Sequence, residues 1–371
     1  MSNSYPPSRR PRGCVLPFLL AVSVFFNLLI CGLMFWPQAS TEEKGPREKH
    51  LYGPHTVADK VAVVRADGTL VEGLDTHILR QIEKAGRDAH VKAIVVRIDS
   101  PGGSIGSSEE IHRELTRVRT GQHPRFSDIT AKPMVASMGS IAASGGYYIA
   151  MPAEKVLAEK STITGSIGVY AALPNVSKLA NDHGVKLELV KAGSIKGSGS
   201  PLHEMTPEER QPWQDMVDQA YDQFLDVVSK GRPQLSKERL RNEVVIRKKA
   251  NVYDEKGNVK KDADGKPIQI SVERVRADGG SFTAAEAKQF GLIDDIGLLE
   301  DAVTAAAKSA GLSTYRVVTY ERDPTLMTML FGKAPTGGPD FEQLANGLTP
   351  RLWYMSPQSE LSGILAASAS R

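Results

Sequence analysis

The feature that most constrains the fold is a short, nearly continuous run of β-branched and aliphatic residues from Val91 to Ile98. A run this apolar is typical of a strand inside a parallel sheet, where helices cover both faces. The segment before it, Leu74 to His90, carries apolar residues at helical spacing, and a further helix is predicted over Ser107 to Arg119. Since strands and helices alternate in this way, we predict an α/β fold with a mainly parallel sheet and flanking helices.

The same alternation continues through most of the chain. Short apolar runs predict further strands at Lys60–Arg65, Pro133–Ser137, Val156–Ala158, Ile167–Val169, Val185–Lys191 and Tyr315–Tyr320. Thr206, Pro207 and Glu209 form a capping-box pattern that predicts a helix start. We therefore expect one α/β domain over residues 60–311, followed by a C-terminal extension over 312–371.

Residues 247–276 interrupt this rhythm. Two turn signals, at residues 254–258 and 262–265, separate polar stretches, which predicts an exposed hairpin inserted into the domain. A calcium-binding loop is a poor alternative because the ligand spacing and the closing glutamate are missing.

The N-terminal region contains an uncharged apolar stretch, residues 14–36. As a helix it would extend about 34 Å, enough to cross a hydrocarbon core of roughly 30 Å. A cleaved signal peptide is the main alternative, but no good Ala-x-Ala site follows the stretch. A lipoprotein attached at Cys31 is disfavoured by Ile30, which is not a small residue. We expect one transmembrane helix over 14–36, between a cytoplasmic tail, 1–13, and a linker, 37–59.

The orientation of this span is predicted from its flanking charges. Arg9, Arg10 and Arg12 lie close to one end, whereas the basic residues after the span lie farther from it. This favours a single-pass protein of the cell (inner) membrane, with its N-terminus inside and its catalytic domain outside the cytoplasm.

Composition excludes several classes of function. The chain has 46 basic and 43 acidic residues and a net charge of +3, which is no footprint for nucleic-acid binding. Both cysteines, Cys14 and Cys31, belong to the apolar stretch, so the rest of the chain has no thiol nucleophile and no disulfide. No metal-ligand spacing occurs among the histidines, and we expect neither a cofactor nor a metal.

Two glycine motifs carry the predicted chemistry. Ser144 is followed by Gly145 and Gly146, which leave its hydroxyl uncrowded, and an earlier Pro-Gly-Gly turn contains Gly103. Each motif follows a predicted parallel strand, and active sites of such sheets gather at the carboxyl ends of strands. A serine nucleophile with backbone N–H groups as an oxyanion hole is therefore expected. The motif is not the α/β-hydrolase elbow, since Ala142 replaces the required first glycine.

As a set, these motifs resemble those of the signal peptide peptidase A family of serine proteases. The matching segments are DSPGGS (99–104), SMGSIAASGGYYIA (137–150), STITGSIGV (161–169), KAGSIKGSGSP (191–201) and FTAAEAKQFGLIDDIG (282–297). The resemblance covers residues 60–311, in the single-copy short form, and implies a fold similar to the Clp protease subunit and the crotonases. The 247–276 insertion and the C-terminal tail depart from the family pattern.

The resemblance also implies roles for individual residues. Ser144 would be the nucleophile, Lys196 the general base and Ser166 the residue that orients the lysine amine. The N–H groups of Gly103 and Gly145 would form the oxyanion hole. Lys191 is the competing base, and Lys196 is preferred on its position in the motif.

A lysine base has to be neutral to accept a proton. An unperturbed lysine is only about 0.04% neutral at pH 7, a handicap of roughly 4.6 kcal/mol. Burial away from carboxylates removes much of this handicap by lowering the lysine pKa. Residues 190–202 contain no acidic residue, which suits that requirement.

We therefore predict a membrane-anchored serine endopeptidase that cleaves signal-peptide remnants or other membrane-associated peptides through a Ser–Lys acyl-enzyme mechanism. An inactive membrane scaffold of the same fold and a crotonase-like acyl-CoA enzyme are the alternatives. In the tandem long form the lysine and serine motifs come from different repeats. A single-copy chain would reproduce that junction as a homo-oligomeric ring. Leu352, Trp353 and Met355 of the tail are candidates for the subunit contact, and packing within the chain is the alternative.

Overall fold

A computed structural model describes residues 23–24, 45–73, 75–254, 256–322 and 351–355. The chain divides into two compact units, residues 1–44 and 45–371. In the first unit only residues 23 and 24 are described, and they are helical. The predicted tail 1–13 and the rest of the predicted span 14–36 lie outside the described residues. Across the described part of the chain, no helix combines the length and the apolar character needed to cross a membrane.

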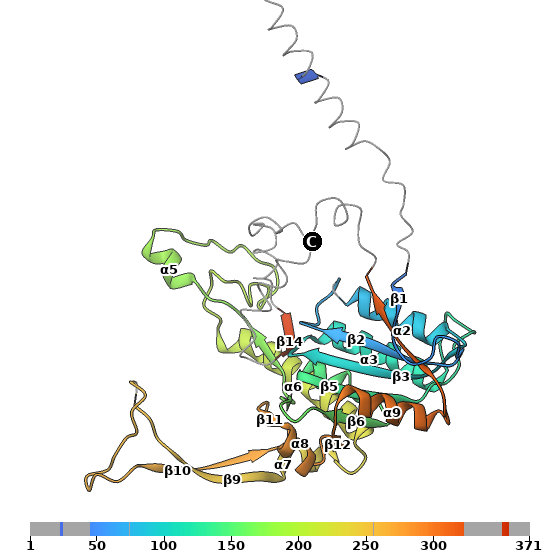
Figure 1. The fold of residues 1–371 in the computed structure, drawn as a ribbon. Coiled ribbons are helices and arrows are strands. Elements are labelled where there is room, and N and C mark those ends of the chain that lie inside the picture. The colour runs from blue at the N-terminus through green and yellow to red at the C-terminus, as the bar shows by residue number, and fades with distance from the viewer. Residues whose placement is uncertain (1–22, 25–44, 74, 255, 323–350, 356–371) are drawn as a thin grey trace, which may run out of the picture. The chain divides into compact units, whose positions relative to one another are not determined.

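The second unit is built on one large, mainly parallel sheet (Figure 1). Its central order is β1-β13-β2-β3-β5-β6-β12, and β7 and β11 join it beside β5. Antiparallel pairing is limited to β1 with β13 and β11 with β7. The strands are β1 (Arg47–Tyr52), β2 (Lys60–Asp67), β3 (Val91–Ser100), β5 (Met134–Ala143), β6 (Lys155–Ala158), β7 (Ile163–Gly165), β11 (Ser281–Thr283), β12 (Asp295–Ile296) and β13 (Arg316–Glu321). The predicted mainly parallel α/β sheet is confirmed.

Helices cover both faces of this sheet, which explains the continuous apolar runs in its central strands. Alternate residues of β3 separate cleanly: Ile94 and Val96 join one core, and Ala93 and Val95 join the other. The larger core packs under the helices α2 (Thr76–Arg87), α3 (Ile105–Thr120), α4 (Gly145–Tyr148), α6 (Pro207–Gly231), α7 (Lys237–Asn242) and α8 (Ala284–Gln289). The smaller core packs under α9 (Leu299–Ser309). A strand that is buried on both faces therefore has no alternation of apolar and polar residues in its sequence.

Two short sheets lie outside the main one. β9 (Val244–Asn251) and β10 (Gln269–Val275) pair antiparallel as a ribbon, which agrees with the hairpin predicted for residues 247–276. β4 (Gly102–Ser104), β14 (Arg351–Met355) and β8 (Tyr170–Ala172) form a second small sheet in which β14 is the central strand. The short helix α5 (Ser177–Asp182) follows β8.

The structure corrects several sequence-based boundaries. The stretch 37–59, expected to be a linker, contains β1, and β13 lies beyond the predicted domain end at residue 311. β13 pairs with β1 on one side and β2 on the other, so the domain includes it. Residues 185–191, expected to form a strand, are exposed and belong to no helix or strand, because no neighbouring strand in the described chain pairs with them. The strand expected at Ile167–Val169 forms earlier, as β7.

Candidate active site

Ser144 occupies the carboxyl end of β5, immediately before α4, in a backbone conformation that is rare for serine. Its φ of 54° and ψ of −114° match the first central residue of a type II′ turn, a position that favours glycine. Its N–H donates to the Gly165 carbonyl at 2.8 Å, and its carbonyl accepts from the Tyr148 N–H at 2.9 Å. The surrounding hydrogen bonds therefore hold a strained residue in place.

The Ser144 hydroxyl is buried but uncommitted. The residue is 1% exposed, and its Oγ has no hydrogen-bond partner among the described residues. A buried hydroxyl normally finds a partner, because leaving it unpaired costs free energy. An unpaired hydroxyl at a strained strand end is expected of a group kept ready for another reactant.

The two glycine motifs, far apart in sequence, pack directly against each other. A Cβ on Gly145 would lie 2.4 Å from Ser108 Oγ and 3.2 Å from both the Gly102 Cα and the Gly103 nitrogen. A Cβ on Gly146 would lie 2.6 Å from the Ser100 carbonyl oxygen. Only glycine permits this approach, which brings the Pro-Gly-Gly turn next to the first turn of α4. The sequence-predicted juxtaposition of Gly103, Ser144 and Gly145 is thus formed within one chain.

Gly103 presents its backbone to the edge of β4 that faces β14. Leu70 uses the opposite edge, where its N–H donates to the Gly102 carbonyl at 2.9 Å and its carbonyl accepts from Ser104 at 2.7 Å. Successive residues of a strand point their N–H and C=O groups to opposite edges. The N–H of Gly103 therefore points away from Leu70, toward the strand that pairs with β4.

Ser166 lies beside Ser144, at the end of β7. It has a φ of 52°, and these two serines are the non-glycine residues with positive φ in the described chain. Its N–H donates to the Gly280 carbonyl and its hydroxyl donates to the Gly279 carbonyl, both at 3.0 Å. The Ser166 oxygen keeps its lone pairs for a donor such as a lysine amine.

Lys196 is not joined to these serines within the chain. It is exposed, in a turn over residues 194–199, and its amine makes no hydrogen bond or ion pair with any described residue. Lys191, the competing base, is instead paired with Glu209 at 3.0 Å. Within the described residues, the turn that contains Gly103 packs against Gly145, and no hydrogen bond joins Lys196 to Ser144 or Ser166.

The loop that carries Lys196 is fastened at both flanks to the first turn of α6. Glu209 Oε1 accepts from Lys191 and its Oε2 contacts His203 Nε2 at 2.9 Å. A backbone hydrogen bond from Thr206, followed by Lys191 and His203, lowers the pKa of Glu209 to about 2. Ser198 adds a third tie, because its hydroxyl donates to the Glu209 carbonyl at 2.9 Å. We call these contacts of Glu209 the Glu209 clamp. The sequence indicates Glu209 only as part of a capping box and does not predict the clamp.

Histidine does not serve Ser144 in the described part of the chain, as its unpaired Oγ shows. His112 is the most perturbed histidine: burial lowers its pKa to about 4, and its ring packs 5.1 Å from that of Tyr148. His203 is committed to Glu209. No cluster of potential metal ligands occurs among the described residues.

Comparison with known proteins agrees with the chemistry of this strand end. Residues 128–245, which contain Ser144, Ser166 and Lys196, match the model of peptidase family S49. The chain is 31% identical over 310 residues to the Synechocystis sp. protein named "Putative protease slr0021", covering 82% of this chain and 94% of that protein. This chain belongs to peptidase family S49.

Other relatives differ in how much of their length is matched. "Protease 4" of Salmonella typhi is 30% identical over 75% of this chain but only 39% of its own length. "Putative signal peptide peptidase SppA" of Enterococcus faecium is 32% identical over 67% of this chain and 60% of its own. The solved structure of a ClpP1 point mutant from Listeria monocytogenes aligns over 65% of this chain and 94% of its own, with 13% identity and a TM-score of 0.36.

Membership of family S49 makes the protein a serine protease and a hydrolase of peptide bonds. It also decides against the crotonase-like acyl-CoA alternative.

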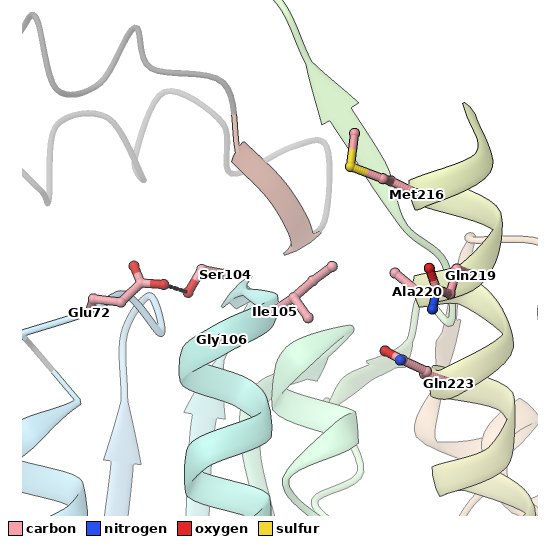
Figure 2. Close-up of a pocket in the computed structure, with 8 residues that line it drawn as sticks. All are labelled: Glu72, Ser104, Ile105, Gly106, Met216, Gln219, Ala220 and Gln223. Atoms are coloured by element: carbon pink, nitrogen blue, oxygen red, sulfur yellow. Dashed lines mark hydrogen bonds between the residues drawn. The ribbon is translucent and has the colours of Figure 1, made fainter. Parts of the chain in front are cut away.

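A pocket opens at Ser104, the residue after Gly103 (Figure 2). It has a volume of about 610 Å³ and lies between the start of α3 and one face of α6. Ser104 and Ile105 line it on one side, and Met216 and Gln223 on the other. Ser104 donates its hydroxyl to Glu72 at 2.8 Å and follows Gly103 directly. The pocket therefore begins one residue after Gly103.

Proposed function

We propose that this S49 peptidase is an endopeptidase in which Ser144 is the nucleophile and Lys196 the general base. The observation that carries the proposal is the strained, buried Ser144 with an unpaired hydroxyl beside Gly103 and Gly145. Ser144 Oγ would attack the peptide carbonyl while Lys196 takes its proton. Lys196 would return that proton to the leaving amine, and water would then hydrolyse the acyl ester.

The oxyanion hole of this proposal consists of two backbone N–H groups. The N–H of Gly145 belongs to the first turn of α4 and has no intrahelical acceptor, and the N–H of Gly103 points out of β4. Removing one donor of an oxyanion hole typically lowers kcat by about 10²–10³-fold. Both donors are main-chain N–H groups, so a substitution that alters the backbone conformation tests their role better than a substitution that only shortens a side chain.

We further propose that Lys196 acts on Ser144 of a neighbouring subunit in a homo-oligomeric ring. Support comes from the exposed Lys196 turn and from Ser166, whose oxygen remains able to accept from an incoming amine. Packing against the neighbour would desolvate the lysine, and desolvation lowers a lysine pKa. We also propose that the fold is of the Clp/crotonase-like class, as the resemblance of the sequence motifs implies.

Subunit mixing tests the shared site. Ser144→Ala and Lys196→Ala should each reduce peptide hydrolysis by several orders of magnitude, because the two residues act as a unit. Mixed under exchange conditions, the inactive variants should regain part of the activity, since some junctions recover both groups. If mass spectrometry verifies mixed oligomers and they stay inactive, the dyad is not shared. Full activity in either single variant would refute the assignment of Ser144 and Lys196 as the catalytic dyad.

The proposal also places the enzyme in the cell (inner) membrane through residues 14–36, with the catalytic domain outside the cytoplasm. Support comes from the uncharged apolar stretch and the arginines before it. Its substrates would be signal-peptide remnants or other membrane-associated peptides, which the name of the Enterococcus faecium relative also suggests. External protease should remove a C-terminal tag from intact spheroplasts, and a tag digested only after lysis would reverse the orientation.

A further inference from the structure

Another cavity lies at the carboxyl ends of β2 and β13. It has a volume of about 600 Å³ and shares no lining residue with the pocket at Ser104. Its walls come from four elements: the ends of β2 and β13, the strand β1 and the first turns of α2. A hollow of this size is in the range of sites that hold small organic molecules, roughly 300–1,000 Å³.

The cavity exists because β2 and β13 separate before they end. β13 pairs with β2 only over Arg316–Thr319 and Lys60–Val63, and both strands continue beyond that point. The separation leaves the backbone of Arg65 without a strand partner on that side, and the side-chain amide of Gln81 takes the partner's place. This amide accepts from the Arg65 N–H at 3.0 Å and donates to the Arg65 carbonyl at 3.1 Å.

The same gap is a switch point in the topology of the sheet. β2 leads through α2 to β3, its neighbour on one side, and α2 covers the larger core. β13, its neighbour on the other side, is reached through α9, which covers the smaller core on the opposite face. The chain thus leaves this point over one face of the sheet and returns over the other. Parallel sheets bind ligands in the crevice at such a point, outside the carboxyl ends of the strands.

The side chains around this cavity carry an excess of positive charge. Lys49, Arg65 and Arg322 line it from three walls, against two carboxylates, those of Asp67 and Glu321. Both carboxylates are paired: Arg65 Nε lies 2.8 Å from Asp67, and Lys49 Nζ lies 2.6 Å from Glu321. In the described part of the chain no carboxylate pairs with Arg322. The lining therefore has one cation without a counter-charge.

His77 experiences the same positive charge from the α2 wall of the cavity. Burial is the main cause that lowers its pKa, followed by the charges of Arg322 and Arg80. The imidazole is therefore neutral at pH 7 and adds no charge of its own. An anion in the cavity would offset the repulsion that these arginines exert on a protonated His77.

Three cations on three walls suit a phosphate group better than a carboxylate. A phosphate monoester has three terminal oxygens and about −1.5 to −2 charges at pH 7, whereas a carboxylate has two oxygens and a single charge. The planar guanidinium of arginine can bond two phosphate oxygens at once. Leu51 and Ile78 also line the cavity and offer apolar surface to the organic part of such a ligand.

We propose that the cavity between the ends of β2 and β13 is a binding site for a phosphate-bearing small organic molecule, with Arg322 as its main contact to the phosphate. Arg65 and Lys49 add donors from the neighbouring walls. The site contains neither Ser144 nor Lys196, so it does not depend on the proposed peptidase chemistry.

Calorimetric titration of the full-length protein in detergent solution tests the site. The probes are adenosine monophosphate (AMP), inorganic phosphate and, as the uncharged control, adenosine. AMP should bind saturably, inorganic phosphate should compete with it, and adenosine should bind at least about tenfold more weakly, since it lacks the charge-assisted hydrogen bonds. Equal affinities for AMP and adenosine would overturn the proposal, and so would the absence of saturable binding by both AMP and inorganic phosphate.

Two variants that each remove one positive charge locate the binding. Arg322→Gln should weaken the binding of AMP at least about tenfold, and its exposed position makes unfolding no concern. Arg247→Gln is the control, because Arg247 is 70% exposed on the β9–β10 ribbon, and it should bind AMP as the wild type does. Equal weakening in both variants would show a response to net charge alone, and unchanged binding in Arg322→Gln would refute the site.

A third variant separates this inference from the proposed function. Ser144→Ala should bind AMP with the affinity of the wild type, because the nucleophile does not line the cavity. Its effect on peptide hydrolysis bears only on the catalytic assignment. Loss of AMP binding in Ser144→Ala would mean that AMP occupies the serine site, which would overturn the proposal.

Discussion

At the residue scale, the defining property of this enzyme is the strain stored at two serines. Ser144 and Ser166 both adopt positive φ at the ends of adjacent strands, and the Ser144 N–H bonds to the residue just before Ser166. Such conformations cost on the order of 1–3 kcal/mol each and persist only where the surroundings enforce them. Glycine would be the easier choice at either position, so the hydroxyls are retained at the expense of stability.

Replacing Ser144 should therefore reveal this strain as an increase in stability. Ser144→Gly removes the Cβ that disfavours positive φ, whereas Ser144→Ala removes only the hydroxyl. We expect Ser144→Gly to unfold with a free energy about 1 kcal/mol higher than that of Ser144→Ala, measured by denaturant titration. Both variants lose the unpaired hydroxyl, so their difference isolates the backbone. Equal stabilities would show that the surroundings do not strain this position.

At the element scale, the site depends on a loop that makes few contacts of its own. Residues 181–196 are exposed throughout, and the ties of the Lys196 loop run to the first turn of α6. Trp213 reinforces them by donating its indole N–H to Ser198 Oγ at 2.7 Å. α6 thus carries the pocket-lining residues Met216 and Gln223 and also holds the flanks of the proposed base.

Glu209→Gln should loosen this loop without unwinding the helix. Glutamine also serves in a capping box, so the bond to the Thr206 N–H is kept while the charge that holds Lys191 is lost. We expect faster amide hydrogen exchange over residues 192–202, with unchanged protection in α6 after its first turn. Lys191→Met should give the same pattern. Unchanged exchange in both variants would mean that the clamp does not hold the loop.

The acid response of the clamp follows from the same carboxylate. The pKa of Glu209 is lowered from 4.5 to about 2, so the ionised form is favoured in the folded chain. Its stabilising contribution is complete above the unfolded-state value and is lost as the pH falls from about 4.5 through about 2. Loop exchange in the wild-type enzyme should therefore approach that of Glu209→Gln only at the acid end of this interval.

Much of this architecture was predictable because its signals are local. The apolar run of β3, the capping box at Thr206 and the glycine motifs around Ser144 each specify their own backbone, and the structure forms all three. β1 was missed because its sequence, REKHLY, has no apolar alternation. The strand expected over 185–191 does not form for the opposite reason: its residues have suitable β propensity, but no described strand pairs with them.

The parts of the site that sequence did not predict depend on distant contacts. Nothing in the sequence of residues 351–355 indicates pairing with residues 102–104 and 170–172. The sequence is compatible with a tail that contacts another subunit or packs within the chain. In the structure, the backbone of residues 351–355 pairs within the chain. The partner proposed for Lys196 lies on a neighbouring subunit, and local sequence patterns do not encode such an assembly.

At the scale of the whole molecule, one segment exposes several apolar side chains that no described element of the fold covers. Val185, Leu187 and Leu189 are each 43–55% exposed, and Val190 is fully exposed. They precede the Lys196 turn, on a segment that belongs to no helix or strand. Exposed apolar clusters of this kind mark interaction sites, and a second subunit that covers this one would also receive Lys196.

Charge placed on this surface should separate the subunits. We expect the double variant Leu187→Asp, Leu189→Asp to sediment as a smaller particle than the wild type and to lose most of its activity. Ile270→Asp is the control, because Ile270 is equally exposed, at 54%, but lies on the β9–β10 ribbon. A wild-type enzyme that sediments as an active monomer would contradict the ring.

β4 and β8 lie on either side of β14, and a substrate that took this place between them would be restricted in its folding state. A segment that enters it must have both rows of main-chain hydrogen-bonding groups free, because a strand edge lies on either side. An edge strand of a folded sheet has only one free row, and a helix has none. Native globular proteins should therefore resist cleavage even where their sequences fit, whereas the same chains should be cut once unfolded. Digesting a reversibly destabilised domain across its unfolding transition would show this, with cleavage rates that follow the unfolded fraction.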